Sequence, residues 1–179
     1  MEISETPPFA FEFNLRDLGR GGAEVRVEAR GDDLARIAAW ADVRGVESFG
    51  ATVELRKHSA TTYSLDALLE ADVVQDCVVT LEPVRSHISG QVHRELHLSD
   101  RVRTKPGESI PLGMGAGDDE VPEEIDSLVY NLAAPLLEEL LLAIDPYPRA
   151  PGVEFAAPTE AVGGPESPFA VLKSLKTPG

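Results

Sequence analysis

Apolar side chains occupy nearly every second position between residues 63 and 81, and this alternation is the clearest pattern in the chain. The apolar positions are Tyr63, Leu65, Ala67, Leu69, Ala71, Val73, Cys77, Val79 and Leu81, and only Gln75 interrupts them. Most positions between them are polar, which predicts a long antiparallel strand with one buried and one solvated face. After Pro83 the apolar residues move to even positions as far as Leu98, which predicts a returning strand that pairs with the first.

Shorter alternations predict further strands at residues 9–13, 25–29 and 49–55, with a turn at residues 19–22. Helical spacing of apolar residues occurs in two places. Asp32 is suited to cap a helix whose apolar positions follow it, and Gly45 is suited to end that helix. The longest helical pattern runs from Glu124 to Ile144, and Pro135 should kink or divide it.

These elements together predict one α+β domain over residues 1–148. In this domain a mainly antiparallel β-sheet is covered on one face by the two helices. Residues 99–123 collect Gly, Pro, Asp and Glu without periodicity, which indicates a mobile acidic loop. Residues 149–179 are rich in Pro and Gly and predict a flexible tail with a short apolar and basic end.

The formal net charge of −15 argues against broad nucleic-acid binding, because affinity for phosphate comes from clustered Lys and Arg. An acidic protein can instead work among nucleic acids by holding a basic protein, and ribosomal proteins are the obvious basic partners. The single cysteine excludes an intramolecular disulfide and suits a reducing compartment. The chain contains no run of about 18 apolar residues, which is the length that a membrane-spanning helix needs. We therefore expect a cytoplasmic protein.

The residues that most often carry catalysis or bind metals have structural interpretations here. Cys77 shares the parity of the apolar residues around it, which favours a small core residue over a reactive thiol. His87, His93 and His97 lie on the polar face of one predicted strand. His93 and His97 would be roughly 13 Å apart there, whereas ligands of one zinc ion lie about 2 Å from the metal. Since GxSxG and GKS motifs are also missing, we expect no catalytic residue, metal or cofactor.

Two groups of residues are candidate contacts for a partner. Beyond the Pro/Gly-rich segment, apolar Phe169 and Leu172 are flanked by Lys173 and Lys176. Such a peptide docks either on its own domain or on a partner protein or RNA, and both alternatives stay open. The second group is a candidate RNA-binding patch on solvent-facing strand positions, which consists of Arg56, Lys57, Arg85 and Arg94.

Four stretches of the chain carry a family resemblance. They read DLARIA at residues 33–38, VQDCVVTLEPV at residues 74–84, EELLLAIDP at residues 138–146 and SPFAVL at residues 167–172. With these stretches the chain resembles the YceD family of bacterial proteins, which is associated with the accumulation of large-subunit ribosomal RNA. The resemblance implies a cytoplasmic accessory of ribosome production and carries over no catalytic residue.

The central motif differs from that of many YceD proteins at one position. Those proteins have a second cysteine three positions after the first, where this chain has Thr80. A zinc or redox role is therefore not expected. We interpret the motif residues as structural; they are Cys77, Thr80, Leu81, Glu82 and Pro83.

The sequence thus favours a non-catalytic accessory factor that binds a ribosomal protein, an assembly factor of the large subunit or a ribonucleoprotein. One alternative is direct RNA binding by the four basic residues of the candidate patch. A further alternative is a metal-dependent hydrolase that uses the acidic residues between positions 118 and 124.

Overall fold

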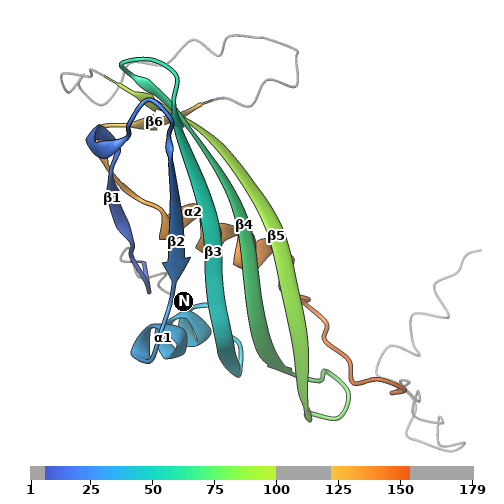
Figure 1. The fold of residues 1–179 in the computed structure, drawn as a ribbon. Helices are drawn as coiled ribbons and strands as arrows, with labels where there is room; N and C mark the ends of the chain where they lie inside the picture. The colour runs from blue at the N-terminus through green and yellow to red at the C-terminus, as the bar shows by residue number, and fades with distance from the viewer. Residues whose placement is uncertain (1–6, 100–121, 154–179) are drawn as a thin grey trace, which may run out of the picture.

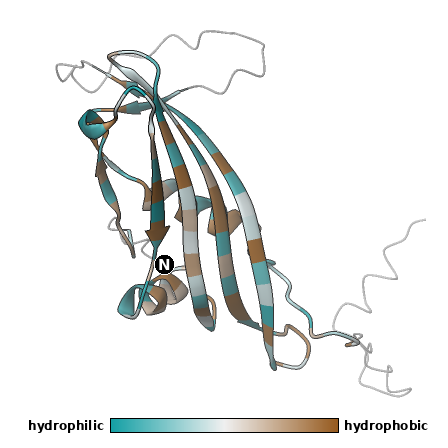
Figure 2. Ribbon diagram, viewed as in Figure 1, coloured by the Kyte–Doolittle hydropathy of each residue, from teal (hydrophilic) through white to brown (hydrophobic). Residues whose placement is uncertain are grey.

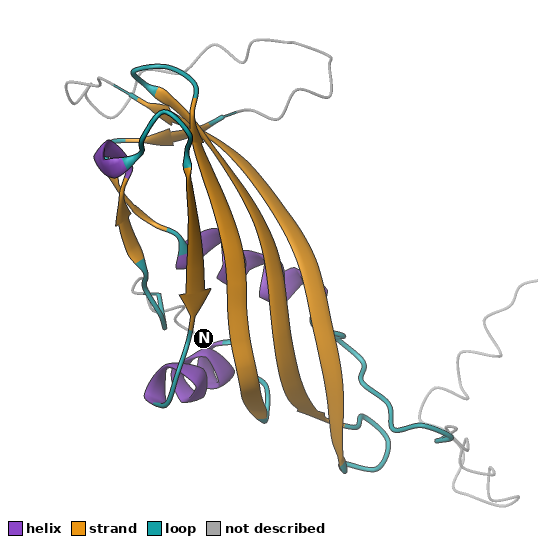
Figure 3. Ribbon diagram, in the orientation of Figure 1, coloured by secondary structure: helices purple, strands orange, loops and turns teal. Residues whose placement is uncertain are grey.

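The computed structural model describes residues 7–99 and 122–153, which form a long curved sheet with one helix behind it and another at one end (Figures 1 and 3). The elements are β1 (Glu12–Asn14), the 3-10 helix η1 (Leu15–Asp17), β2 (Ala23–Glu28), α1 (Asp32–Trp40), β3 (Gly45–Lys57), β4 (Thr62–Asp76), β5 (Pro83–Leu98), β6 (Glu123–Ile125), β7 (Val129–Asn131) and α2 (Ala133–Ala143). The α+β prediction is confirmed. The acidic loop expected at 99–123, apart from its ends, and the tail beyond residue 153 lie outside the described residues.

The main sheet has the strand order β2-β3-β4-β5-β6, with β4 at its centre. Its first four strands are antiparallel neighbours, and β6 is parallel to β5. The predicted pairing of the two longest strands is confirmed, because β4 and β5 pair from Thr62↔His97 to Asp76↔Pro83. Odd residues of β4 are buried and even residues of β5 are buried or half-buried, and Figure 2 shows the resulting bands of apolar and polar residues along the strands.

Both helices contribute to one hydrophobic core on the inner face of the sheet. Helix α2 lies behind the long strands (Figure 1) and buries Leu136, Leu137 and Leu140. Gly90 of β5 leaves room for a side chain of this helix, since a Cβ atom at residue 90 would lie 2.9 Å from Cγ of Glu139. Helix α1 packs beside β3 and buries Ile37.

The prediction of one helix from Glu124 to Ile144 is wrong in its first half. Residues Glu123–Ile125 form β6 beside the end of β5, and Val129–Asn131 form β7, which pairs with β1. The apolar residues there satisfy two periods at once, because Leu128, Tyr130 and Leu132 also alternate as a strand requires. Pairing with β5 and β1 supplies backbone hydrogen bonds that a local pattern does not reveal.

Pro135 stands at the start of α2 and does not divide a longer helix. It is the third residue of the helix, where the missing N–H would have no partner within the helix in any case. The side chain of Asn131 caps this end, because its Oδ1 accepts hydrogen bonds from the N–H groups of Ala133 (3.1 Å) and Phe11 (2.8 Å). The same oxygen thus joins the helix to the chain before β1.

The turn at residues 19–22 provides a test of this fold. Gly22 has φ +80°, and a Cβ atom there would lie 2.4 Å from the carbonyl oxygen of Leu55, so Gly22→Ala should lower the free energy of unfolding by about 2 kcal/mol or more. Gly21→Ala is the matched control, because a Cβ atom at residue 21 meets nothing within 4 Å. It should change the free energy by less than about 0.5 kcal/mol. Urea unfolding of both variants measures the difference, and equal effects would contradict this backbone conformation.

Candidate functional site

The outer face of the long strands is not covered by any helix or strand among residues 7–99 and 122–153 (Figure 1). Its side chains come from the even positions of β2, β3 and β4 and from the odd positions of β5. We call this surface the open face. Its paired positions carry eight carboxylates and three guanidinium groups, namely Glu24, Glu28, Glu54, Asp66, Glu70, Asp72, Asp76 and Glu95, and Arg26, Arg56 and Arg85.

The carboxylates of the open face fall into two rows that cross neighbouring strands. In the first row Glu24 is paired with Glu54, and Glu54 with Asp66. In the second row Glu28 and Glu70 lie on either side of Gly50. Like charges at directly opposite positions of a sheet are destabilising, so the first row weakens the fold.

The row between the two acidic rows holds Arg26 on β2 and uncharged residues on the next three strands. Thr52 is paired with Leu68, and Leu68 with Gln91, so these residues form an uncharged strip across three strands. Leu68 is 56% exposed although it lies on the central strand. Two open hollows of about 670 and 610 Å³ meet at Thr52 and Leu68, and each is bordered by one of the acidic rows.

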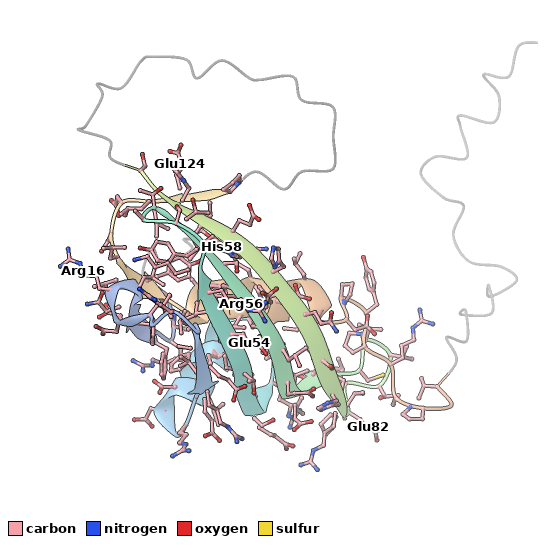
Figure 4. The ribbon with its side chains drawn as sticks, turned by 45° about the horizontal axis from the view of Figure 1, so that its top comes forward. Arg16, Glu54, Arg56, His58, Glu82 and Glu124 are labelled. Atoms are coloured by element: carbon pink, nitrogen blue, oxygen red, sulfur yellow. The ribbon has the colours of Figure 1, made fainter. Side chains whose placement is uncertain are left out.

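Nearby cations neutralise only part of this charge. Arg56 lies 2.9 Å from Glu54, and Figure 4 shows the two side chains next to each other on the sheet. Nδ1 of His93 lies 2.6 Å from Asp66. Because such exposed pairs contribute little to stability, they do not remove the acidic character of the face.

His87 is held between two carboxylates at one end of the open face. Its Nδ1 lies 2.8 Å from Asp72 and its Nε2 lies 2.7 Å from Glu70. Hydrogen bonds to Asp72 and Glu70 raise the pKa of His87. The hydroxyl of Ser48 donates to Asp72 at 2.7 Å, and together with His87 it lowers the pKa of Asp72.

The candidate RNA-binding residues do not form one patch. Arg94 is on the inner side of the sheet, where it lies 3.2 Å from Glu138 of α2, so its predicted solvent-facing position is wrong. Lys57 occupies an odd position of β3 and therefore does not belong to the open face. Its Nζ lies 5.7 Å from the centre of the Tyr63 ring. Arg56 and Arg85 face outward at opposite ends of the sheet, about ten residues or 33 Å apart.

The motif residues between Cys77 and Pro83 form the tight turn that joins β4 to β5. Cys77 has no exposed surface, in agreement with its parity. Its Sγ accepts hydrogen bonds from the N–H groups of Ala150 (3.4 Å) and Thr80 (3.5 Å). Hydrogen bonding, above all by the Thr80 side chain and the Ala150 N–H, lowers the pKa of Cys77 to about 7, although burial acts in the opposite direction.

The sequence did not reveal that the chain after α2 packs on this turn. The N–H of Val78 donates to the carbonyl oxygen of Pro148 at 2.9 Å, in addition to the bond between Ala150 and Cys77. Residues on both sides of the expected domain boundary at position 148 are therefore attached to the turn. Phe169, Leu172, Lys173 and Lys176 lie outside the described residues.

Neither a metal cluster nor a membrane span emerges from the described part of the chain. No group of three or more His, Cys, Asp or Glu side chains there is placed to hold a metal ion. Of the acidic loop residues, Glu123 and Glu124 lie in β6, and the Tyr130 hydroxyl donates to Glu123 at 3.0 Å. No described helix is long and apolar enough to cross a membrane.

Comparison with known protein families gives one match, and that match includes the motif turn. A family model described as "Large ribosomal RNA subunit accumulation protein YceD" matches residues 65–176. The chain belongs to the YceD family. The match includes most of β4, all of β5, the motif turn and most of the tail, whereas the DLARIA stretch in α1 lies before it. No curated protein and no solved structure matches the chain.

The motif turn of this YceD protein allows a direct titration. Thr80→Val removes the hydroxyl that acts on Cys77, so the midpoint of thiolate formation should rise from about 7 toward the ordinary value of 9.0. Cys77 is the only cysteine, so ultraviolet absorbance of the thiolate reports it alone. Thr52→Val on the open face is the control and should leave the midpoint unchanged. An unchanged midpoint in Thr80→Val would contradict the role of the hydroxyl.

His87 should make stability depend on pH. Because its pKa is raised in the folded protein, its contribution is fully present below the ordinary histidine value of 6.5 and is lost as pH rises through the folded pKa. His87→Gln should therefore lower the unfolding temperature at about pH 5.5 and have little effect at about pH 9. In a Glu70→Gln/Asp72→Asn background this difference should disappear. An equal loss at both pH values would count against the carboxylate contacts.

Proposed function

We propose that this YceD protein is a non-catalytic accessory factor in the accumulation of large-subunit ribosomal RNA and that it binds a basic protein on its open face. Family membership supplies the process. The observation that carries the mode of binding is the arrangement of two acidic rows on either side of exposed Leu68. The proposal assigns no reaction to any residue.

The first acidic row supports binding because its like-charged pairs weaken the fold. Glu24, Glu54 and Asp66 occupy directly paired positions, and each like-charged pair costs a few tenths of a kcal/mol up to about 1 kcal/mol. A Lys or Arg side chain placed between these carboxylates would relieve the repulsion. The free energy lost in folding is then recovered when a basic partner binds.

The spacing of the face suggests what the partner presents. The two rows are four residues apart along each strand, which is about 13 Å. A segment that lies across the strip would place basic groups near both rows and cover Leu68 with an apolar or aliphatic stem. Lys- and Arg-rich segments of a ribosomal protein or an assembly factor have this chemistry.

The overall charge agrees with a protein partner rather than with bare RNA. A net charge of −15 repels phosphate, and the outward-facing Arg56 and Arg85 are too far apart to form one phosphate-binding patch. The same charge attracts basic proteins and accelerates their association. RNA is then reached through the bound protein.

Neutralising the first acidic row tests this function. The triple variant Glu24→Gln/Glu54→Gln/Asp66→Asn removes the repulsion, so its unfolding temperature should be equal to or higher than that of the unchanged protein. Capture from lysate should retain at least about tenfold less ribosomal protein or assembly factor, which corresponds to a loss of about 1.4 kcal/mol. In cells that lack the gene, the variant should fail to restore the level of large-subunit ribosomal RNA.

The control variant removes the same charge elsewhere. Glu12→Gln/Asp17→Asn/Asp126→Asn changes three exposed carboxylates that do not lie on the open face, and it should behave like the unchanged protein. Full restoration of the RNA by the first triple variant would refute the assigned face. Normal large-subunit RNA in cells without the gene would refute the function itself.

A further inference from the structure

The motif turn exposes an unusual set of apolar side chains. Val78, Val79 and Leu81 are 48%, 36% and 73% exposed within one turn between two strands. Tyr147, which precedes Pro148 beside this turn, is 71% exposed. Polar residues and glycine normally occupy such turns, so apolar residues here indicate a surface that another segment covers.

The conformation of Leu81 supports this interpretation. Its φ is +61°, a left-handed conformation that disfavours every residue with a Cβ atom. Its exposed side chain adds little to the core, so the fold has no evident need for leucine where glycine would be relaxed. Strain of this kind that packing does not explain is typical of a functional contact.

The turn is also held in place before anything binds. The N–H of Leu81 donates to the carbonyl oxygen of Cys77 at 2.9 Å, and the N–H of Cys77 donates to the carbonyl oxygen of Glu82 at 2.8 Å. Val78 is bonded to Pro148 from outside the turn. A turn fixed by these bonds loses little entropy when its apolar side chains are covered.

The remaining length of the chain starts next to this surface. Ala150 is bonded to Cys77, and the described chain ends three residues later at Val153. Phe169 is 16 residues beyond that point, and a flexible linker of that length spans about 22 Å on average. A flexible linker of that length would give the apolar tail segment an effective concentration in the millimolar range at the turn.

Charge and family membership point to the same segment. Lys173 and Lys176 follow the apolar tail residues Phe169 and Leu172. Glu82 and Asp145 are exposed and have the opposite charge. Asp145 is held close to the turn because its carbonyl oxygen accepts a 2.8 Å hydrogen bond from the side chain of Gln75. Figure 4 places Glu82 at the turn end of the sheet, opposite Glu124. The family match covers both the turn and the tail as far as residue 176.

We infer that residues 168–176 dock on the motif turn of their own chain. Phe169 and Leu172 cover the surface formed by Val79, Leu81 and Tyr147, and the two lysines lie near Glu82 and Asp145. The family motif and the tail thus form one unit, separate from the open face and independent of the proposed function.

Photocrosslinking of the full chain tests this contact. Phe169 is replaced by p-benzoylphenylalanine, and mass spectrometry identifies the peptides that become attached after irradiation. The expected product is an intramolecular link to residues 78–82 or Tyr147 whose yield does not change on dilution. Leu81→Gly should reduce the yield about tenfold, as expected for the loss of one covered leucine, while the unfolding temperature stays equal or rises.

Val129→Ser is the matched control, because Val129 is 48% exposed on β7, away from the turn. It should leave the yield of the link unchanged. A link found only between two molecules, a link to another part of the domain, or an equal yield in the Leu81→Gly chain would each overturn docking on the chain's own turn.

Discussion

The fold depends on the pairing of β4 with β3 on one side and with β5 on the other. Every odd side chain of β4 from Tyr63 to Val73 is buried, so a shift of one residue in either pairing would expose this whole set. Helix α2 packs against that inner face, next to Gly90. The buried face therefore also determines which side chains are left on the outside.

The open face is a consequence of the same register. The acidity of the chain is not spread evenly, because pairing places Glu24, Glu54 and Asp66 next to one another across three strands. Carboxylates at these positions oppose folding, and a sheet with a well-packed inner face tolerates that loss. A surface that costs stability in the free protein is well suited to a partner of opposite charge.

The family motif combines two kinds of residue. Cys77 is enclosed and accepts hydrogen bonds from both the turn and the segment after α2, so it helps join β4, β5 and the end of the described chain. The hydroxyl of Thr80 acts on the sulfur of Cys77 and lowers the pKa of the thiol. Val79 and Leu81 are instead exposed, so the structural interpretation of the motif accounts for only part of it.

The sequence by itself determined the pairing of the two longest strands and the first helix, because alternation and helical spacing over many residues each have one good solution. It extended the first long strand to Leu81, whereas β4 ends at Asp76 and Val79 and Leu81 are exposed in the turn. It did not determine the ends of short elements, since Leu128 and Leu132 fit helical spacing as well as the strand spacing that they share with Tyr130, until β1 and β5 provide partners. The inward position of Arg94 follows from parity relative to Val92 and Leu96, but its contact with Glu138 requires α2. Only tertiary structure brought the acidic rows together and placed Ala150 on Cys77, because register between distant strands and docking of a connecting segment are set by packing, not by local pattern.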